Sequence, residues 1–353
     1  MEQWQRSLSE SITCPEELAK CFSIDPGPLR SVVERYPMLI TQYYLSLIQQ
    51  VGDPIWRQCV PDPYELEEDH FLTDPLNELK LTPAPGLIHR YPDRVVLLVS
   101  SICATVCRFC MRKSWIACKG VLNTGNSVDE GLSYIERTPA IRDVILSGGD
   151  SLLLTDEVLE DILTRLRKIP HLEIIRIGTR TPVTLPDRIT PRLCGMLKRY
   201  HPLYVNTHFN HPLEITPQSA TACHMLADAG IPLGNQTVLL KGVNDDPEVM
   251  KQLMQQLLTI RVRPYYLHQM DLVKGTAHFR TSVEQGLKIM AGLRGHTSGM
   301  AVPYYVIDLP QGKGKAPLLP NEVRRDGKTL FLCNYLGEVV EYEDCGEPNE
   351  ADR

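Results

Sequence analysis

The stretch RVVLLVSSICATVCRFC, residues 94–110, decides the fold class of this chain. It opens with an apolar run of strand length, VVLLVS (95–100), and passes directly into three cysteines, Cys103, Cys107 and Cys110. Thiols that follow a strand so closely are expected on the loop at its carboxyl end. Further apolar runs follow along the chain, and each is succeeded by a turn and a stretch with helical periodicity.

This alternation of strands and helices predicts an α/β fold. The later runs are DVILSG (143–148), EIIRIG (173–178), LYVNTH (203–208), NQTVLL (235–240) and PYYLH (264–268). The expected helices are 128–137, 156–169, 186–200, 217–229, 247–260 and 282–294. Near-continuous apolar strands between helices are typical of a parallel sheet covered by helices. Six such units predict a partial (β/α)6-type barrel, whose chemistry lies at the carboxyl ends of the strands.

The chain divides into three expected regions. Residues 1–85 form an N-terminal extension, helical and irregular, with a helical stretch over 31–51. Residues 86–298 form the core barrel. Residues 299–353 form a C-terminal segment that begins with a strand, AVPYYVID (301–308), and ends in a β-like tail.

Composition excludes several classes of protein. The net charge of −6 argues against a nucleic-acid partner, because binding to a polyanion normally requires a basic surplus. No apolar run has the length of a membrane span, and the N-terminus lacks the apolar segment of a secretory signal. We therefore expect a cytoplasmic protein with no membrane partner.

The cysteine triplet predicts an iron-sulfur cluster. The chain has 11 cysteines, an odd number, and a reducing compartment favours metal ligation over a disulfide framework. Zinc would require a fourth Cys or His at knuckle spacing, which the sequence lacks. Three thiolates on one loop suit a 4Fe-4S cluster with one open iron, and this iron can chelate S-adenosylmethionine.

The Cx3Cx2C spacing after a first barrel strand resembles the radical S-adenosylmethionine superfamily. A glycine-rich stretch, LSGGD (146–150), ends the next strand, where glycines permit close approach of a ligand to the backbone. By itself GGD is only a turn. The resemblance implies that S-adenosylmethionine contacts Ser147, Gly148, Gly149, Asp150 and Gln236.

Residues 85–342 resemble the lysine 2,3-aminomutase family nearly without gaps. The motifs include PGLIHRYPDRVVLLVS (85–100), CRFCMRK (107–113) and DLPQGKGKAPLLPN (308–321). The resemblance implies pyridoxal 5′-phosphate on the catalytic Lys315 rather than on Lys313. It also places Arg90, Tyr91 and Arg94 near this cofactor. Without the resemblance, the segment with Arg90, Tyr91 and Arg94 and the segment with Lys313 and Lys315 would both be interpreted as exposed loops.

The resemblance further implies that the enzyme moves the 2-amino group of L-lysine to C3, which gives β-lysine. Arg112 would pair with the substrate carboxylate, and Asp271 and Asp308 would receive the side-chain ammonium. Two carboxylates around one cation are sound chemistry, whereas a carboxylate side chain would meet repulsion. Expected partners are a reductant such as flavodoxin or ferredoxin, and further copies of this chain in a homo-oligomer.

Two departures from the family pattern leave alternatives open. The stretch His268-Gln269-Met270 differs from the tyrosine-containing version of bacterial lysine enzymes, so arginine or a modified lysine is a second substrate hypothesis. The zinc-binding cysteine tail of longer members is missing, and Asp246 stands where its partner cysteine would be, so no zinc is expected.

In missing the zinc-binding tail, the chain is similar to the aminomutase that makes β-lysine for elongation factor P. The DLPQGKGK motif favours the free-lysine enzyme instead. A third hypothesis is a non-catalytic protein that binds the cluster or pyridoxal phosphate and has kept only the fold.

Overall fold

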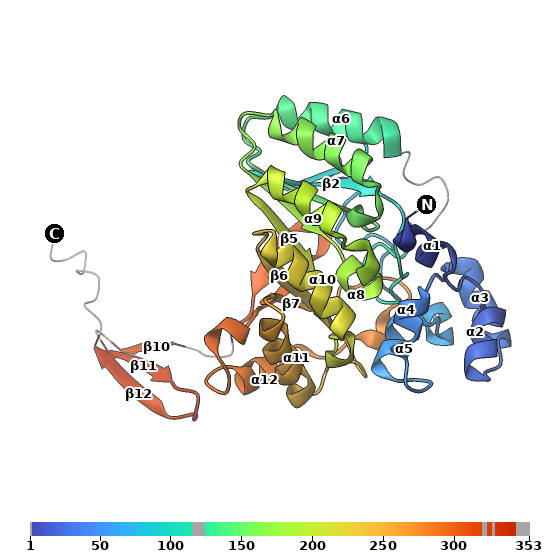
Figure 1. The fold of residues 1–353 in the computed structure, drawn as a ribbon. Coiled ribbons are helices and arrows are strands. Elements are labelled where there is room, and N and C mark those ends of the chain that lie inside the picture. The colour runs from blue at the N-terminus through green and yellow to red at the C-terminus, as the bar shows by residue number, and fades with distance from the viewer. Residues whose placement is uncertain (1, 115–123, 320–322, 327–328, 344–353) are drawn as a thin grey trace.

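The computed structural model describes residues 2–114, 124–319, 323–326 and 329–343. Within these ranges the strands form a nine-stranded sheet, in the order β1 to β9, and a separate three-stranded sheet, β10 to β12 (Figure 1). The strands of the large sheet are β1 (Leu87–Tyr91), β2 (Arg94–Ser100), β3 (Asp143–Gly148), β4 (Ile174–Gly178), β5 (Leu203–Thr207), β6 (Leu233–Leu239), β7 (Arg263–Gln269), β8 (Tyr304–Asp308) and β9 (Lys315–Pro317). Those of the small sheet are β10 (Arg324–Asp326), β11 (Thr329–Cys333) and β12 (Val339–Glu343).

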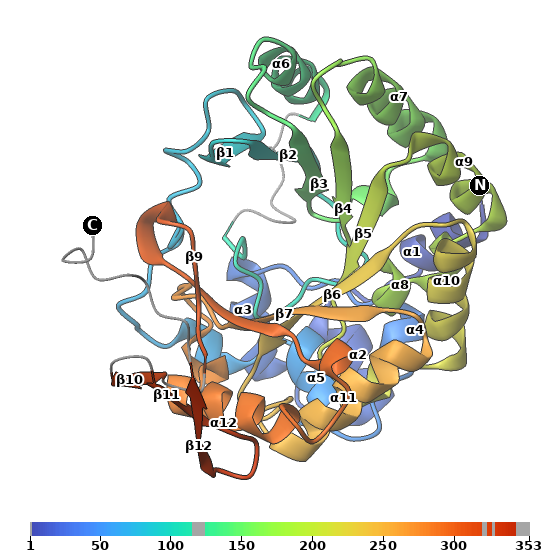
Figure 2. The same cartoon turned by 90° about the vertical axis from the view of Figure 1, so that its left-hand side faces the viewer.

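The large sheet is mostly parallel and strongly curled. Each strand from β2 to β8 runs parallel to its neighbour, while β1 and β9 are antiparallel strands at the two edges. Figure 2 shows the sheet curling round from β1 to β9 with helices on its outer side. The predicted α/β fold with a partial barrel of parallel strands is therefore confirmed.

The helices alternate with the strands as predicted. The N-terminal helices are α1 (Gln3–Ser9), α2 (Pro15–Phe22), α3 (Gly27–Arg35), α4 (Gln42–Leu45) and α5 (Pro54–Cys59). Those of the barrel are α6 (Thr124–Glu136), α7 (Asp156–Arg167), α8 (Thr181–Thr184), α9 (Pro191–Leu197), α10 (Pro217–Asp228), α11 (Pro247–Thr259) and α12 (Val283–Leu293). Several begin at a side chain that accepts hydrogen bonds from first-turn amides, such as Thr155, Thr216 and Asp246.

Two expected helices are interrupted, both because of proline. The stretch 31–51 is not one helix, since α3 ends at Arg35 and α4 begins only at Gln42. Pro37 disfavours helical geometry in the residue before it, and Tyr36 is extended at φ −128° and ψ 98°. In 186–200, Pro191 acts in the same way on Thr190, which is extended and caps α9.

The two faces of the curled sheet differ in polarity. Its outer face is mostly apolar and buried under the helices, as at Val144, Leu146, Ile175, Ile177 and Val205, and its few polar side chains, such as Asn235 and Thr237, are buried too. Its inner face keeps partial solvent access and carries polar side chains on successive strands. These include Ser147, Arg176, Asn206, Gln236, His268 and Asp308. A parallel sheet usually buries apolar residues on both faces, so the polar inner face marks the place for ligands.

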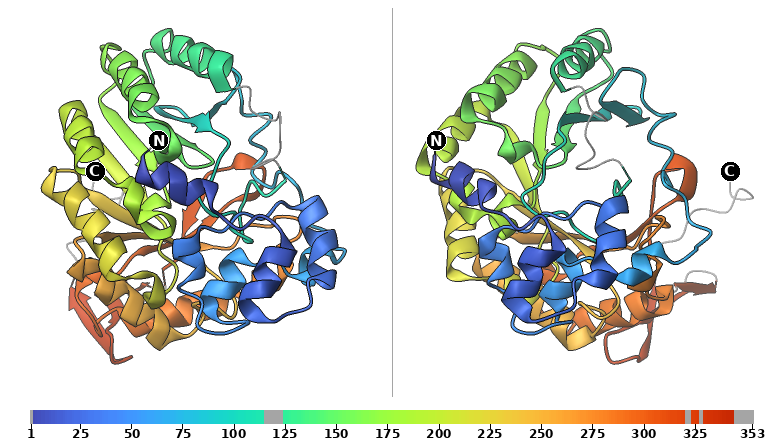
Figure 3. Two further views of the ribbon diagram at one scale, coloured as in Figure 1. Left: turned by 45° about the vertical axis from the view of Figure 1, so that its right-hand side comes forward. Right: turned by 90° about the vertical axis from the view of Figure 1, so that its right-hand side faces the viewer.

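The N-terminal extension packs against the cysteine loop, residues 101–113. Figure 3 shows the N-terminal helices gathered at one end of the curled sheet. Ile40 forms a β-bridge with Thr105, and the amide of Arg108 donates to the carbonyl of Gln58 at 2.9 Å. The extension therefore shapes the loop on which the three cysteines lie.

A buried ion cluster strengthens this contact. Glu65 pairs with Arg108 at 2.5 Å and with Lys113 at 2.6 Å, and all three side chains are at most 1% exposed. Burial raises the pKa of Glu65, but the charges of Arg108 and Lys113 outweigh it and hold the pKa below its ordinary value. The carboxylate is thus charged, and it ties the cysteine loop to the extension at one residue between Cys107 and Cys110 and at another after Cys110.

The small sheet projects away from the barrel (Figure 1). It carries exposed apolar side chains, including Val339, Val340 and Tyr342. Among the residues that the structure describes, no helix has the length and apolarity of a membrane span.

Candidate active site

Cys103, Cys107 and Cys110 lie together on the loop after β2, as predicted. All three are free thiols with intermediate exposure. In a tight turn, the amide of Cys110 donates to the carbonyl of Cys107 at 3.2 Å. Burial, followed by repulsion from the neighbouring thiols, raises the pKa of Cys103 and raises that of Cys110 to about 11. Thiols held this close suit a metal cluster, which would bind them as thiolates.

Within the described ranges, no three His, Cys, Asp or Glu side chains surround a position for a single metal ion. The Cys107 and Cys110 thiols are near enough to raise the pKa of Cys103, but the three thiols do not surround a position for a single metal ion. A multinuclear cluster fits this donor set, because its sulfur ligands stand further apart than the ligands of one ion.

The glycines of LSGGD are required by close backbone packing. A Cβ on Gly148 would lie 2.2 Å from the carbonyl oxygen of Ser100, and one on Gly149 would lie 2.3 Å from that of Ile102. Gly148 also has a φ of +128°, which side chains rarely adopt. The end of β3 therefore packs closely against the start of the cysteine loop.

The other residues expected around S-adenosylmethionine occupy different positions. Ser147 on β3 and Gln236 on β6 both lie on the inner face of the sheet. Asp150 instead accepts hydrogen bonds from the hydroxyl of Thr179 at 2.6 Å and from the amide of Arg180 at 2.7 Å. Its carboxylate binds the end of β4, so its contribution to a ligand site is to position that strand end.

Arg112 is held by a partner that the sequence did not reveal. Its Nε and Nη2 donate to the two carboxylate oxygens of Glu78 at 2.8 and 2.9 Å, and its Nη1 lies 3.5 Å from the hydroxyl of Ser147. Both charged side chains are largely buried. Because Glu78 occupies one edge of the guanidinium, the remaining edge is directed to the end of β3.

Lys315 lies in a cluster of charged groups around Asp308. The Asp308 carboxylate accepts from Lys315 Nζ at 2.5 Å, from Arg90 Nη1 at 3.2 Å and lies 3.2 Å from His268 Nδ1. Burial opposes the charge of Asp308, yet these partners hold its pKa well below its ordinary value. Lys313, by contrast, is exposed.

The charged side chains around Asp308 join the two edges of the sheet. Arg90 belongs to β1 and Asp308 to the end of β8, 218 positions apart in the chain. A Cβ on Gly312 would lie 2.4 Å from a methyl of Leu81, and the amide of Gln311 donates to the carbonyl of Pro75 at 2.9 Å. The segment before β1 thus closes the open side of the barrel beside Lys315.

Asp271, just after β7, has a different electrostatic character. Within the described part of the chain its carboxylate has no ion-pair partner. Burial, followed by repulsion from Asp308, raises its pKa to about 7. A partly buried carboxylate of this kind is destabilised when ionised, and a bound cation would relieve that cost.

The residues expected around pyridoxal phosphate are only partly brought together. The Arg94 guanidinium lies 4.0 Å from the Tyr91 ring centre, and Lys315 Nζ lies 5.8 Å from that of Tyr266. Aromatic rings, a lysine and an exposed arginine fit a phosphorylated pyridine. Arg90 pairs with Asp308, whereas Arg94 pairs with Asp93, so the two arginines do not share one anionic partner.

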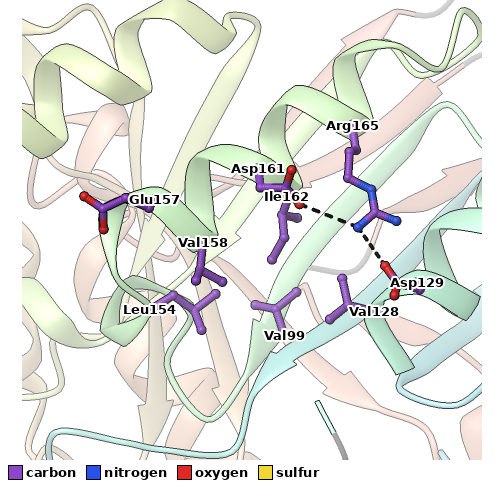
Figure 4. Close-up of a pocket in the computed structure, with 9 residues that line it drawn as sticks. All are labelled: Val99, Val128, Asp129, Leu154, Glu157, Val158, Asp161, Ile162 and Arg165. Atoms are coloured by element: carbon purple, nitrogen blue, oxygen red, sulfur yellow. Dashed lines mark ion pairs between the residues drawn. The ribbon is translucent and has the colours of Figure 1, made fainter. Parts of the chain in front are cut away.

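A groove of about 430 Å³ lies elsewhere, on the outer surface between β2, α6 and α7. Figure 4 shows its apolar floor and the ion pairs of Arg165 with Asp129 and Asp161. None of the predicted site residues lines it. The site described above is therefore separate from this groove.

Sequence reasoning missed three residues of this site. Glu78 and Glu65 lie in the acidic N-terminal extension, which carries no recognisable motif. Arg180 follows β4 and donates to the sulfur of Cys107 at 2.7 Å. The only available indication was its position at the carboxyl end of a barrel strand.

Comparison with known proteins assigns first the class and then the family. Residues 97–254 match the model of the radical SAM superfamily, and residues 290–352 match a model described as lysine-2,3-aminomutase. The L-lysine 2,3-aminomutase of Fusobacterium nucleatum is 49% identical over 97% of this chain and 82% of that protein. That of Clostridium subterminale is also 49% identical, over 97% and 84%.

The glutamate 2,3-aminomutase of Clostridioides difficile is 46% identical over 97% of this chain and 82% of that protein. This chain thus belongs to the lysine 2,3-aminomutase family of radical SAM enzymes and is an aminomutase, a kind of isomerase. Membership of the superfamily implies a 4Fe-4S cluster and S-adenosylmethionine, and the family acts on amino acids. Lysine and glutamate enzymes are similarly close, so identity alone does not choose the substrate.

Proposed function

We propose that this enzyme converts L-lysine to β-lysine, with pyridoxal phosphate carried by Lys315. The observation that carries the choice of lysine is the Asp271 carboxylate, which has a raised pKa and, among the described residues, no ion-pair partner. The ammonium of a lysine side chain would supply the missing cation. A glutamate side chain would instead bring a third carboxylate toward Asp271 and Asp308.

When bound, the cluster and S-adenosylmethionine supply an adenosyl radical, and pyridoxal phosphate supplies a π-system through which nitrogen can migrate. The chain's own residues position the reactants. Cys103, Cys107 and Cys110 would hold the cluster, and Ser147 and Gln236, on the inner face of the sheet, would contact S-adenosylmethionine. Tyr91 and Arg94 provide the aromatic and cationic contacts for the pyridoxal phosphate.

The substrate is held at both ends in this proposal. Arg112 binds the α-carboxylate, and Glu78 holds its guanidinium in position. Asp271 receives the side-chain ammonium. Asp308, already paired with three groups, acts mainly as the counter-ion that keeps Lys315, Arg90 and His268 in place.

The assay of the proposal is anaerobic turnover by the reconstituted protein with S-adenosylmethionine and dithionite. L-Lysine, L-glutamate and L-arginine are supplied separately, and products are separated by chromatography. We expect β-lysine from lysine and no product from glutamate. Arginine is the second candidate substrate, because its guanidinium could also pair with Asp271. Turnover of glutamate without turnover of lysine would overturn the proposal.

Replacing Asp271 with asparagine should change both efficiency and pH dependence. The raised pKa means that the carboxylate is largely neutral below pH 7 and charged above it. Because an ammonium binds the charged form, we expect wild-type kcat/KM for lysine to rise as pH increases through about 7. Asp271→Asn should lower kcat/KM above this pH by on the order of tenfold to a hundredfold, the worth of a hydrogen bond to a charged group.

The ratio of kcat/KM between wild type and Asp271→Asn isolates the titration of the Asp271 carboxylate, because other titrating groups affect both proteins alike. The ratio should grow with pH and then level off. Asp228→Asn is a suitable control, since Asp228 is exposed and pairs with Arg261 at the surface. A ratio that does not vary with pH would contradict the assignment of Asp271.

Replacing Glu78 with glutamine should weaken substrate binding more than it slows turnover. Glu78 immobilises the Arg112 guanidinium through two hydrogen bonds. Loss of that orientation is expected to raise KM for lysine by about tenfold, which corresponds to the ordering of one flexible side chain. KM and kcat are measured separately. An unchanged KM with a reduced kcat would show that Glu78 does not act through substrate binding.

Two partners belong to the proposal. A one-electron donor such as flavodoxin or ferredoxin reduces the cluster. A homo-oligomer is supported by the small projecting sheet, where Val339 is 63% exposed and Tyr342 is 57% exposed. Apolar side chains on so small a sheet favour contact with another surface.

A further inference from the structure

Arg180 is a buried cation next to one of the three cluster cysteines. It follows β4, is 8% exposed, and its Nη1 donates to the sulfur of Cys107 at 2.7 Å. Hydrogen bonds from charged donors to the sulfur ligands of an iron-sulfur cluster are among the features that set its reduction potential.

The guanidinium is fixed in place by groups on every other side. Its Nε donates to the carbonyl of His208 at 3.2 Å. Its Nη2 lies 2.6 Å from the Gln58 side-chain oxygen, 2.7 Å from Glu214 and 2.9 Å from the Tyr44 hydroxyl. These contacts occupy Nε and Nη2, so Nη1 is directed at the sulfur.

The partners of Arg180 are themselves rigid. Glu214 and Tyr44 are both fully buried, and the Tyr44 hydroxyl donates to Glu214 at 2.6 Å. The second oxygen of Glu214 accepts from the amides of Asn210 and His211 at 2.5 and 2.9 Å. Tyr44 and Gln58 come from the N-terminal extension, which therefore holds the cation against the cysteine loop.

We propose that Arg180 raises the reduction potential of the cluster through a charge-assisted hydrogen bond to Cys107. This inference rests on the proposed function, because it assumes a 4Fe-4S cluster on the three cysteines. One-electron reduction adds a negative charge to the cluster. A cation that contacts a ligand sulfur stabilises the reduced form more than the oxidised form, and burial keeps water from screening the interaction.

The arrangement also explains how Glu214 can neutralise Arg180 without cancelling its effect. Glu214 contacts Nη2, whereas Cys107 contacts Nη1. The positive group is therefore the nearer of the two charges to the sulfur. Arg180 acts through Cys107 and is a positioning residue for the electrostatics of the cluster.

The test is a potentiometric titration of the reconstituted full-length protein, in which the EPR signal of the reduced cluster is followed. We expect Arg180→Gln to lower the ratio of reduced to oxidised cluster at a given potential by about tenfold. For one electron this corresponds to a midpoint about 59 mV more negative. Tyr44→Phe is the matched control, because it removes one hydrogen-bonding group of the same buried network while Arg180 and its bond to Cys107 remain.

The midpoint separates an electrostatic role from a purely structural one. A structural defect would reduce the amount of cluster without shifting the midpoint of the cluster that forms. A wild-type midpoint in Arg180→Gln, or an equal shift in Tyr44→Phe, would overturn the proposal. If Arg180→Gln binds no cluster, Arg180→Lys decides, since it keeps the charge but loses the directed donor. Its midpoint should be more negative than that of wild type, and an unchanged midpoint would refute the hydrogen bond.

The wild-type protein distinguishes this inference from the cluster assignment. Absence of any reduced-cluster signal after reconstitution would reject the assignment and the inference with it. A normal wild-type signal with unchanged midpoints in both Arg180 variants would reject the inference alone.

Discussion

Replacing Lys315 with alanine is expected to abolish aminomutase activity, with a loss on the order of 10⁴-fold or more. Lys315 Nζ lies between the Asp308 carboxylate and the Tyr266 ring, on the partly exposed inner side of the barrel. In the proposed function this amine holds pyridoxal phosphate covalently and releases it to an incoming amino acid, so its removal should stop both steps. The visible absorbance of the lysine-bound cofactor should disappear together with β-lysine formation.

Lys313 provides a matched control two residues away. It is an exposed side chain on the same glycine-rich loop, so Lys313→Ala should keep both the absorbance and most of the activity. Equal losses in the two variants would indicate that the loop as a whole, rather than the Lys315 amine, is required. Persistence of the absorbance in Lys315→Ala would reject the assignment of this lysine.

Replacing Glu65 with glutamine is expected to destabilise the fold by about 3–5 kcal/mol, the cost of removing one partner from a buried ion cluster. Arg108 and Lys113 would remain buried without their counter-charge. Arg108 lies between Cys107 and Cys110, and Lys113 lies three residues after Cys110, so we also expect less iron to be retained. Midpoints of urea unfolding under anaerobic conditions measure the first effect, and iron content measures the second.

The contribution of Glu65 to folding stability depends on pH. The pKa of Glu65 is lowered in the folded state, so its contribution to stability is present above the pKa of an unfolded glutamate. It is lost as pH falls through the lowered value. Glu173→Gln is the control, because Glu173 forms an exposed pair with Arg142 and should contribute little. Similar unfolding midpoints for the two variants would contradict the importance of the buried cluster.

Much of the fold followed from local patterns in the chain. Apolar runs of strand length predicted the parallel strands, since a strand buried under helices must be apolar on that side. Capping residues such as Thr155 and Asp246 predicted helix starts, because they satisfy amides of their own first turn. The predictions failed where proline intervened, as at Pro37 and Pro191, and periodicity alone did not register the break.

The predicted site was incomplete for a different reason. Cys103, Cys107 and Cys110 form a local motif, so their spacing alone indicated their chemistry. The residues that hold the site in place are distant in the chain. Glu78 precedes Arg112 by 34 positions, and Arg180 follows Cys107 by 73. No spacing rule connects such pairs.

The sequence by itself determined the class of fold, because apolar runs and helical periodicity depend on residues that are near one another in the chain. It also predicted the three cysteines for a cluster from their spacing, and the lysine for pyridoxal phosphate from the family resemblance. Only the tertiary structure decided the charge state and partners of the site. Curling of the sheet brings Arg90 on β1 to Asp308 at the end of β8, and the N-terminal extension brings Glu65 and Glu78 to the cysteine loop. The physical reason is that burial and Coulomb interactions depend on distance in space, which the order of residues does not specify.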